Sequence, residues 1–179
     1  MEMGAGRGRW VLGTVATLSS LLVCLWLMPM RVPGTTLLGS GPHWLLVWLV
    51  AWSLNRPPLV AAIVGATVGL LQDGLGVPGH GWWPSHGVGL ALAGGLTALL
   101  QKQRYVQEDF VSVSLIVFGM ATVVETVYAL QLSALGYPLT TVWSAHQRHV
   151  LVTAILTSLW APVVHVPMLR LWRWLEQPV

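Results

Sequence analysis

Six long apolar runs, joined by short polar links, restrict what this chain can fold into. They cover residues 10–29, 37–54, 58–72, 86–101, 110–132 and 149–169. Only 8% of the 179 residues are charged, whereas about a quarter of the residues in soluble domains carry a charge. A water-soluble fold would leave long stretches of Leu, Val, Trp and Ala exposed. The composition therefore excludes a soluble enzyme, a disordered tail and a nucleic-acid binder.

Each apolar run is a candidate transmembrane helix, because about 20 apolar residues cross the roughly 30 Å of hydrocarbon in a bilayer. We predict an all-α integral membrane protein with about six transmembrane helices in a single domain, residues 1–179. Residues 10–29 are too long for the apolar core of a signal peptide and lack a small-residue cleavage site, so we predict a retained helix. Residues 58–72 span only about 22 Å. This segment either crosses a locally thinned bilayer or forms a hairpin with the preceding run.

The lysines and arginines predict the orientation, since cytoplasmic loops are enriched in them. With six crossings and a cytoplasmic N-terminus, seven of the nine fall inside: Arg7, Arg9, Arg56, Lys102, Arg104, Arg170 and Arg173. Arg31 and Arg148 fall outside. If residues 58–72 did not cross, the split would be four inside against five outside, and the bias would vanish. We therefore predict that both termini are cytoplasmic. The second and third runs could instead form a deep hairpin that enters the membrane from the outside and returns to that side. The later runs would then keep the same orientation, and both termini would still be cytoplasmic.

Glu125 is the one formally charged residue deep within an apolar run. A carboxylate there costs several kcal/mol unless it is paired or protonated. Its neighbours at helical spacing include Ala121, Thr122, Tyr128 and Ala129, a small and polar strip that we expect to face other helices. Glu125 is either a carboxylate that binds a proton or a ligand, or a packing carboxyl group that is hydrogen-bonded to a neighbouring helix.

Small residues recur every four positions in the third run, at Ala61, Gly65 and Gly69, and Asp73 closes the same helical face. Such a face lets another helix approach to contact distance, which favours helix association in lipid. The approaching helix belongs either to this chain or to a partner protein. Asp73 lies beside a turn-prone, glycine-rich stretch, and its carboxylate can accept backbone N–H bonds and hold the loop.

The sequence contains no recognisable catalytic or metal-binding motif. His80 and His86 share a predicted outer loop with Trp82 and Trp83, and His146 lies in the other long outer loop, residues 133–148. No HExxH, CxxC or calcium-loop pattern accompanies these histidines, and no GxSxG elbow is present. We therefore predict no enzyme activity, no metal and no cofactor, and we expect the loop tryptophans to lie at the level of the lipid headgroups.

Several stretches along almost the whole chain resemble the bacterial rod-shape-determining membrane protein family MreD. The most specific is Gly69-Leu70-Leu71-Gln72-Asp73, followed by a glycine-rich turn. The inserted-looking stretch Gly79 to Pro84 departs from the family pattern. The other matching features are Gly8-Arg9-Trp10, Pro42-His43-Trp44-Leu45-Leu46, Trp52 near Arg56-Pro57, the acid Glu125 and Trp160-Ala161-Pro162.

The resemblance implies a non-enzymatic, multi-pass subunit of the cell-elongation complex in the bacterial cytoplasmic (inner) membrane. Such a subunit maintains rod shape by binding MreC, with MreB, RodA and penicillin-binding protein 2 in the wider complex. The family also resembles the six-helix substrate-binding subunits of energy-coupling-factor transporters in fold. On this basis we expect Gly65, Gly69, Asp73 and Glu125 to bind the partner.

The alternative function is a substrate-binding membrane subunit of an energy-coupling-factor type vitamin transporter. In that case Glu125, Tyr128 and Gln131, with the outer loops that carry histidines, would line a vitamin-sized pocket. Recovery of a paired ATPase module with its coupling membrane subunit would distinguish this function from cell elongation.

Overall fold

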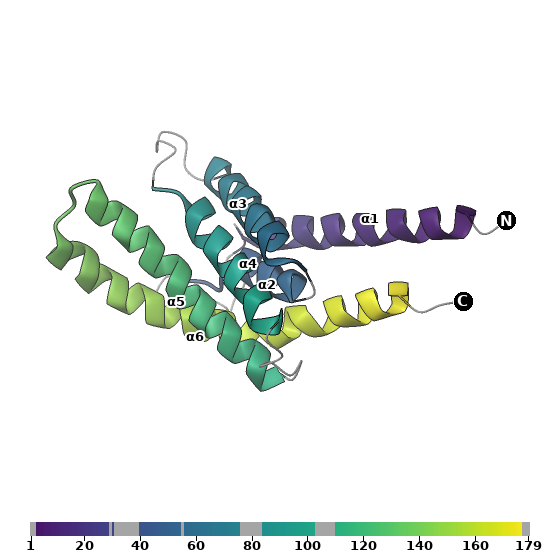
Figure 1. The fold of residues 1–179 in the computed structure, drawn as a ribbon. Helices are drawn as coiled ribbons and strands as arrows, with labels where there is room; N and C mark the ends of the chain where they lie inside the picture. Colours follow the sequence, from purple (N-terminus) through teal and green to yellow (C-terminus); the bar gives the residue numbers. More distant parts are fainter. Residues whose placement is uncertain are drawn as a thin grey trace.

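The computed structural model describes residues 3–28, 30, 40–54, 56–75, 84–102 and 110–176. The regular elements in this part of the chain are six α-helices (Figure 1). These are α1 (Met3–Leu27), α2 (Trp44–Ser53), α3 (Pro58–Gly74), α4 (His86–Lys102), α5 (Phe110–Ala134) and α6 (Leu139–Glu176). The predicted all-α class is confirmed. The loop residues Gly79 to Trp83, with His80, lie outside the described residues.

Three helices follow the predicted runs closely, and three differ from them. α1 begins at Met3, seven residues before the predicted run 10–29. α3, α4 and α5 begin where the sequence predicts and end within two residues of the predicted position. The prediction that residues 133–148 form a long loop is wrong, because α6 begins at Leu139 and includes His146 and Arg148. α6 continues through Pro162 and Pro167, and Figure 1 shows it changing direction between its green and yellow parts. A proline removes one backbone hydrogen bond and bends a helix in this way.

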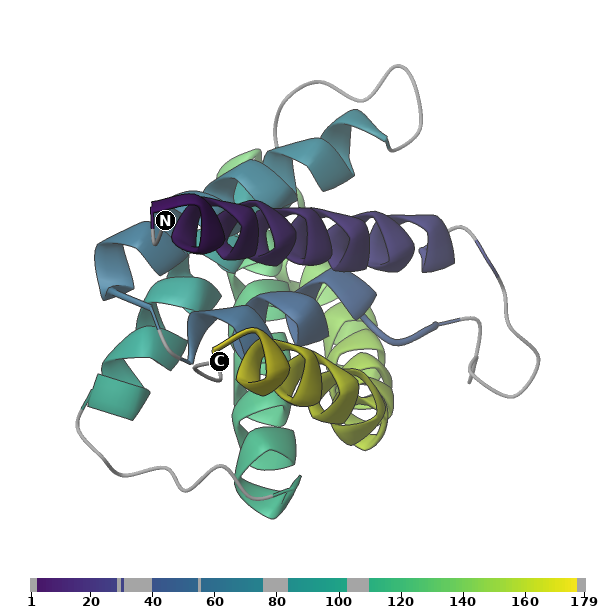
Figure 2. The same cartoon turned by 90° about the vertical axis from the view of Figure 1, so that its right-hand side faces the viewer.

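α2 is a short helix in the centre of the bundle. It has ten residues, a length of about 15 Å, and it packs against each of the other five described helices. Figure 2 shows it between α1 and the yellow end of α6. Nine of its ten residues are buried, because tryptophan, leucine and valine cover all its faces and such a helix belongs in a core. The predicted second span, residues 37–54, is therefore helical only from Trp44 among the described residues.

The outer surface of the bundle is apolar. Large hydrophobic side chains are exposed along α1, α3, α4, α5 and α6, with Leu59, Val111 and Leu115 at least 70% exposed. By length and composition, Phe110–Ala134 and Leu139–Leu171 are candidate membrane spans, and the other described apolar helices are shorter. Large apolar residues outside and a central apolar helix are typical of a protein that lies in lipid.

α3 and α4 form the most extensive contact between any two described helices. Small residues allow this approach: a Cβ atom added at Gly65 would overlap the carbonyl oxygen of Leu90, and one added at Gly69 would lie 2.5 Å from the Cα atom of Gly87. A Cβ atom at Gly94 would lie 2.5 Å from the carbonyl oxygen of Ala61. The small-residue face of α3 therefore packs against the chain's own α4.

Replacing Gly65 with alanine should destabilise the protein by about 1–3 kcal/mol, because the new methyl group meets backbone atoms that cannot rotate away. Gly119→Ala is the matched control, since Gly119 is also inside a helix but has no atom within 4 Å of an added Cβ. The control should be neutral or stabilising by up to about 1 kcal/mol. Thermal unfolding of both variants in one detergent measures the difference. Equal midpoints would contradict the close α3–α4 contact.

Candidate functional site

Asp73, at the end of α3, holds the beginning of α4. Its carboxylate accepts the hydroxyl of Ser85 at 2.7 Å and the backbone N–H of His86 at 2.9 Å, and it pairs with His86 Nδ1 at 2.6 Å. The Ser85 hydroxyl also accepts the backbone N–H of Gly87 at 3.0 Å. The first backbone N–H groups of a helix have no partner within the helix. Asp73 and Ser85 satisfy two of them for α4, as expected for a carboxylate that accepts backbone N–H bonds.

α5 contributes two side chains to the same end of α4. The Gln131 amide accepts the backbone N–H of Ser85 at 2.9 Å and donates to its carbonyl oxygen at 3.0 Å. The Tyr128 ring stacks on the His86 ring, with centroids 4.6 Å apart and planes 24° apart. The sequence suggested both residues as pocket-lining groups. In the structure they instead fix α5 against the α3–α4 pair.

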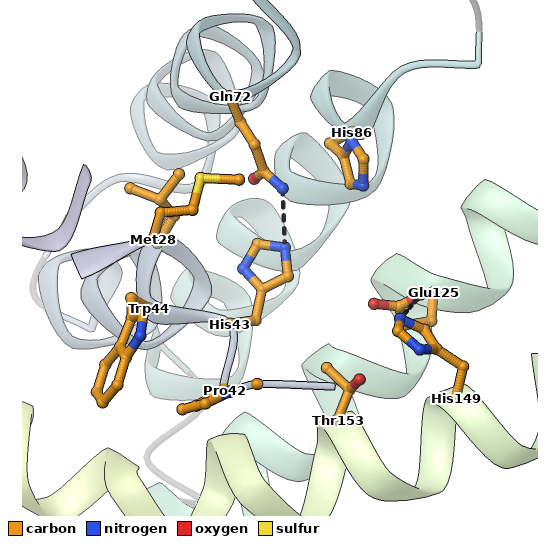
Figure 3. Close-up of a pocket in the computed structure, with 11 residues that line it drawn as sticks. Met28, Pro42, His43, Trp44, Gln72, His86, Glu125, His149 and Thr153 are labelled. Carbon is orange, nitrogen blue, oxygen red and sulfur yellow. Dashed lines mark hydrogen bonds and ion pairs between the residues drawn. The ribbon is translucent and has the colours of Figure 1, made fainter. Parts of the chain in front are cut away.

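A cavity of about 240 Å³ lies beside this cluster. In Figure 3, His86 and Gln72 lie above the space, Thr153 lies below it, and His43 and Glu125 lie on either side. The lining residues come from α2, α3, α4, α5, α6 and the segments before α2: Met28, Gly41, Pro42, His43, Trp44, Leu45, Gln72, His86, Glu125, His149 and Thr153. Six polar side chains from five different helix regions therefore converge on one space.

Glu125 is placed on the side of α5 that faces the protein. Its helical neighbours Ala121 and Ala129 are buried, as the sequence predicts. Its carboxylate is 12% exposed and lies 3.9 Å from His149 Nε2 of α6, and His149 Nδ1 lies 3.0 Å from the Ser40 hydroxyl. A distance of 3.9 Å is an ion-pair distance and exceeds a hydrogen bond. Glu125 is therefore close to an imidazole yet remains available to the cavity.

His43 is fixed at the beginning of α2 by contacts with three elements. Its backbone N–H donates to Thr157 Oγ1 of α6 at 3.0 Å, and its Nδ1 accepts the backbone N–H of Leu46 at 3.2 Å. Its Nε2 lies 3.5 Å from the side-chain amide of Gln72, the contact drawn in Figure 3. The sequence analysis did not assign His43 to a site. The detectable signal was its position just before an apolar helix, where a side chain can cap the helix.

The four residues predicted to bind a partner divide into two pairs. Gly65 and Gly69 are buried against α4, so a partner helix at these positions would have to displace α4. Asp73 and Glu125 are partly accessible, with side chains 19% and 12% exposed. Partner binding by these four residues stays a prediction.

Sequence reasoning did not identify Gln72, His149 and Thr153 as members of one site. They belong to α3 and α6, and only the tertiary packing brings them together. No group of three His, Cys, Asp or Glu side chains among the described residues could hold a metal ion.

Comparisons of the chain with protein-family models, with curated proteins and with solved structures find no match. Functional assignment consequently depends on the residues of the site and on the sequence resemblance.

Thr153 and Thr157, one turn apart on α6, provide a test of the local geometry. Both are buried, but the Thr157 hydroxyl accepts the His43 N–H, whereas the Thr153 hydroxyl has no hydrogen-bond partner in the described part of the chain. Thr157→Val should cost about 1–3 kcal/mol, because it leaves the His43 N–H unsatisfied. Thr153→Val should be neutral or stabilising. Thermal unfolding compares them, and a larger loss for Thr153→Val would contradict this arrangement.

Proposed function

We propose that this protein is a non-enzymatic, multi-pass subunit of the bacterial cell-elongation machinery, similar to MreD. It binds MreC in the cytoplasmic membrane and so couples MreB to peptidoglycan synthesis by RodA and penicillin-binding protein 2. The observation that carries the proposal is the Gly69 to Asp73 stretch, the most specific part of the resemblance. In the structure this stretch forms the end of α3, where Gly69 contacts α4 and Asp73 holds its first turn.

The positions of the helix ends support six crossings with both termini in the cytoplasm. Figure 1 shows the beginning of α1 and the end of α6 on one side of the bundle and the α5–α6 turn on the opposite side. Beginning and ending on the same side requires an even number of crossings. In this arrangement the Asp73 cluster and the cavity lie toward the outer face of the membrane, where MreC has its periplasmic domain.

The α3–α4 hairpin is the element that we propose MreC contacts. Gly65 and Gly69 have no free surface in the isolated chain, so they act by building the hairpin and not by touching the partner. Asp73 fixes the hairpin at its outer end, and its partly exposed carboxylate can meet a polar group of the partner.

The alternative function, a substrate-binding subunit of a vitamin transporter, requires the cavity to hold the vitamin. The cavity's volume of about 240 Å³ is below the usual range for drug-sized ligands, about 300–1,000 Å³. It therefore fits a small molecule better than a large vitamin.

Affinity purification of the tagged protein from its native membranes in a mild detergent, followed by mass spectrometry, tests the proposal. We expect MreC to co-purify, together with RodA or penicillin-binding protein 2. Recovery of an ATPase module with its coupling membrane subunit would contradict the proposal and establish the transporter function.

A matched pair of glycine variants tests the contact itself. Gly65→Leu should lower the recovery of MreC severalfold, because α3 and α4 are forced apart, whereas Gly119→Leu should leave recovery unchanged. Equal amounts of both variants in the membrane are required for the comparison. Normal MreC recovery with correctly inserted Gly65→Leu would show that the hairpin is not the contact.

A further inference from the structure

We propose that the cavity between α2, α3, α4, α5 and α6 binds a small organic cation that carries a protonated amine, with Glu125 as its counter-charge. This inference is independent of the proposed partner, because it concerns only side chains that line the cavity.

The charge of the cavity points to a cation. Among the described residues that line it, Glu125 is the only carboxylate, and none is a lysine or an arginine. The nearest basic group, His149 Nε2, is 3.9 Å away on a side chain that is 54% exposed. A largely buried carboxylate needs a charged or hydrogen-bonding partner, since removing it from water is costly. An ammonium group of a ligand would supply a positive charge and hydrogen-bond donors to this carboxylate.

The polar atoms around the space provide further hydrogen-bond acceptors. Thr153 Oγ1 has no hydrogen-bond partner among the described residues, and Thr153 is 3% exposed. His86 Nδ1 is engaged by Asp73, so an imidazole that donates from Nδ1 has an acceptor at Nε2. An ammonium group has three donors and no acceptor. It therefore complements this lining better than a carboxylate or a phosphate does.

The remaining walls suit an apolar body on the ligand. Met28, Pro42, Trp44 and Leu45 line the cavity with Glu125. An engineered cavity of about 150 Å³ holds benzene, so about 240 Å³ accommodates one ring with a short side chain. The ligand is therefore a small aromatic or aliphatic amine.

Three compounds with the same ring and chain length test the charge preference: 2-phenylethylamine, 2-phenylethanol and phenylacetate. Each is titrated into the full-length protein in an uncharged detergent, and thermal unfolding is followed. A ligand that binds only the folded state raises the midpoint with its concentration. We expect the amine to bind roughly tenfold or more tightly than the alcohol and phenylacetate not to bind. Equal or tighter binding of the alcohol or the acid, or no shift with any compound, would overturn the proposal.

Two substitutions locate the site. Glu125→Gln should abolish the preference for the amine, whereas Glu176→Gln, the same change at the end of α6, should retain it. Thr153→Val, which removes an unpartnered hydroxyl, should weaken amine binding severalfold without loss of folded protein. The Thr153→Val variant still tests the location of the site if the Glu125→Gln protein does not fold. Unchanged amine binding in both cavity variants would overturn the assignment to this cavity.

An organic ammonium group reaches a membrane protein either as a dissolved amine or as the headgroup of phosphatidylethanolamine. Adding this lipid to the protein with bound 2-phenylethylamine distinguishes the sources, with phosphatidylglycerol of the same acyl chains as the control. Displacement by phosphatidylethanolamine alone identifies the lipid headgroup as the occupant. Retention of the amine with both lipids identifies a dissolved amine. Equal displacement by both lipids would show that acyl chains fill the cavity and would overturn the proposal.

Discussion

The close approach of α3 to α4 is the contact on which the rest of this structure depends. Gly65, Gly69 and Gly94 have no side chain, and this allows the backbones of the two helices to come into direct contact. Hydrophobic burial supplies little association energy between helices in lipid, so van der Waals packing and polar contacts must hold them together. This packing brings the end of α3 beside the beginning of α4, where Asp73 can reach Ser85 and His86.

The distribution of residue sizes follows from the same constraint. Small residues lie between α3 and α4, and large hydrophobic residues are either around α2 or on the outer surface. α2 contacts all five other helices, so its first turn can present His43 and Trp44 to a space that α3, α4, α5 and α6 also reach. The polar cavity thus lies at the beginning of the short central helix α2, where the longer helices extend past it.

Local features of the sequence predicted a large part of the fold. Runs of apolar residues gave α3, α4 and α5, and the four-residue spacing of Ala61, Gly65 and Gly69 correctly indicated a helix-packing face. The beginning of α6 was missed because the stretch Leu139 to Arg148 contains several polar residues and a histidine, which suggested a loop. The true length of α2 was missed because an apolar run alone does not show where within it a helix begins.

The candidate site was only partly predictable, for a related reason. Asp73 and Glu125 are conspicuous as acids beside or within apolar runs, and both lie at or next to the cavity. Gln72, His149 and Thr153 carry no such local signal. Their convergence depends on how α3, α5 and α6 cross, which is a property of long-range packing.

Labelling of single cysteines with a membrane-impermeant maleimide is the most direct test of the proposed six-span arrangement, in which the cavity lies at the outer face. Cys24, the only native cysteine, is first replaced by alanine. In intact spheroplasts, Tyr137→Cys in the α5–α6 turn should react, whereas Arg56→Cys between α2 and α3 should react only after the membrane is permeabilised. Reaction of both cysteines from the same side, or the reverse pattern, would contradict this arrangement.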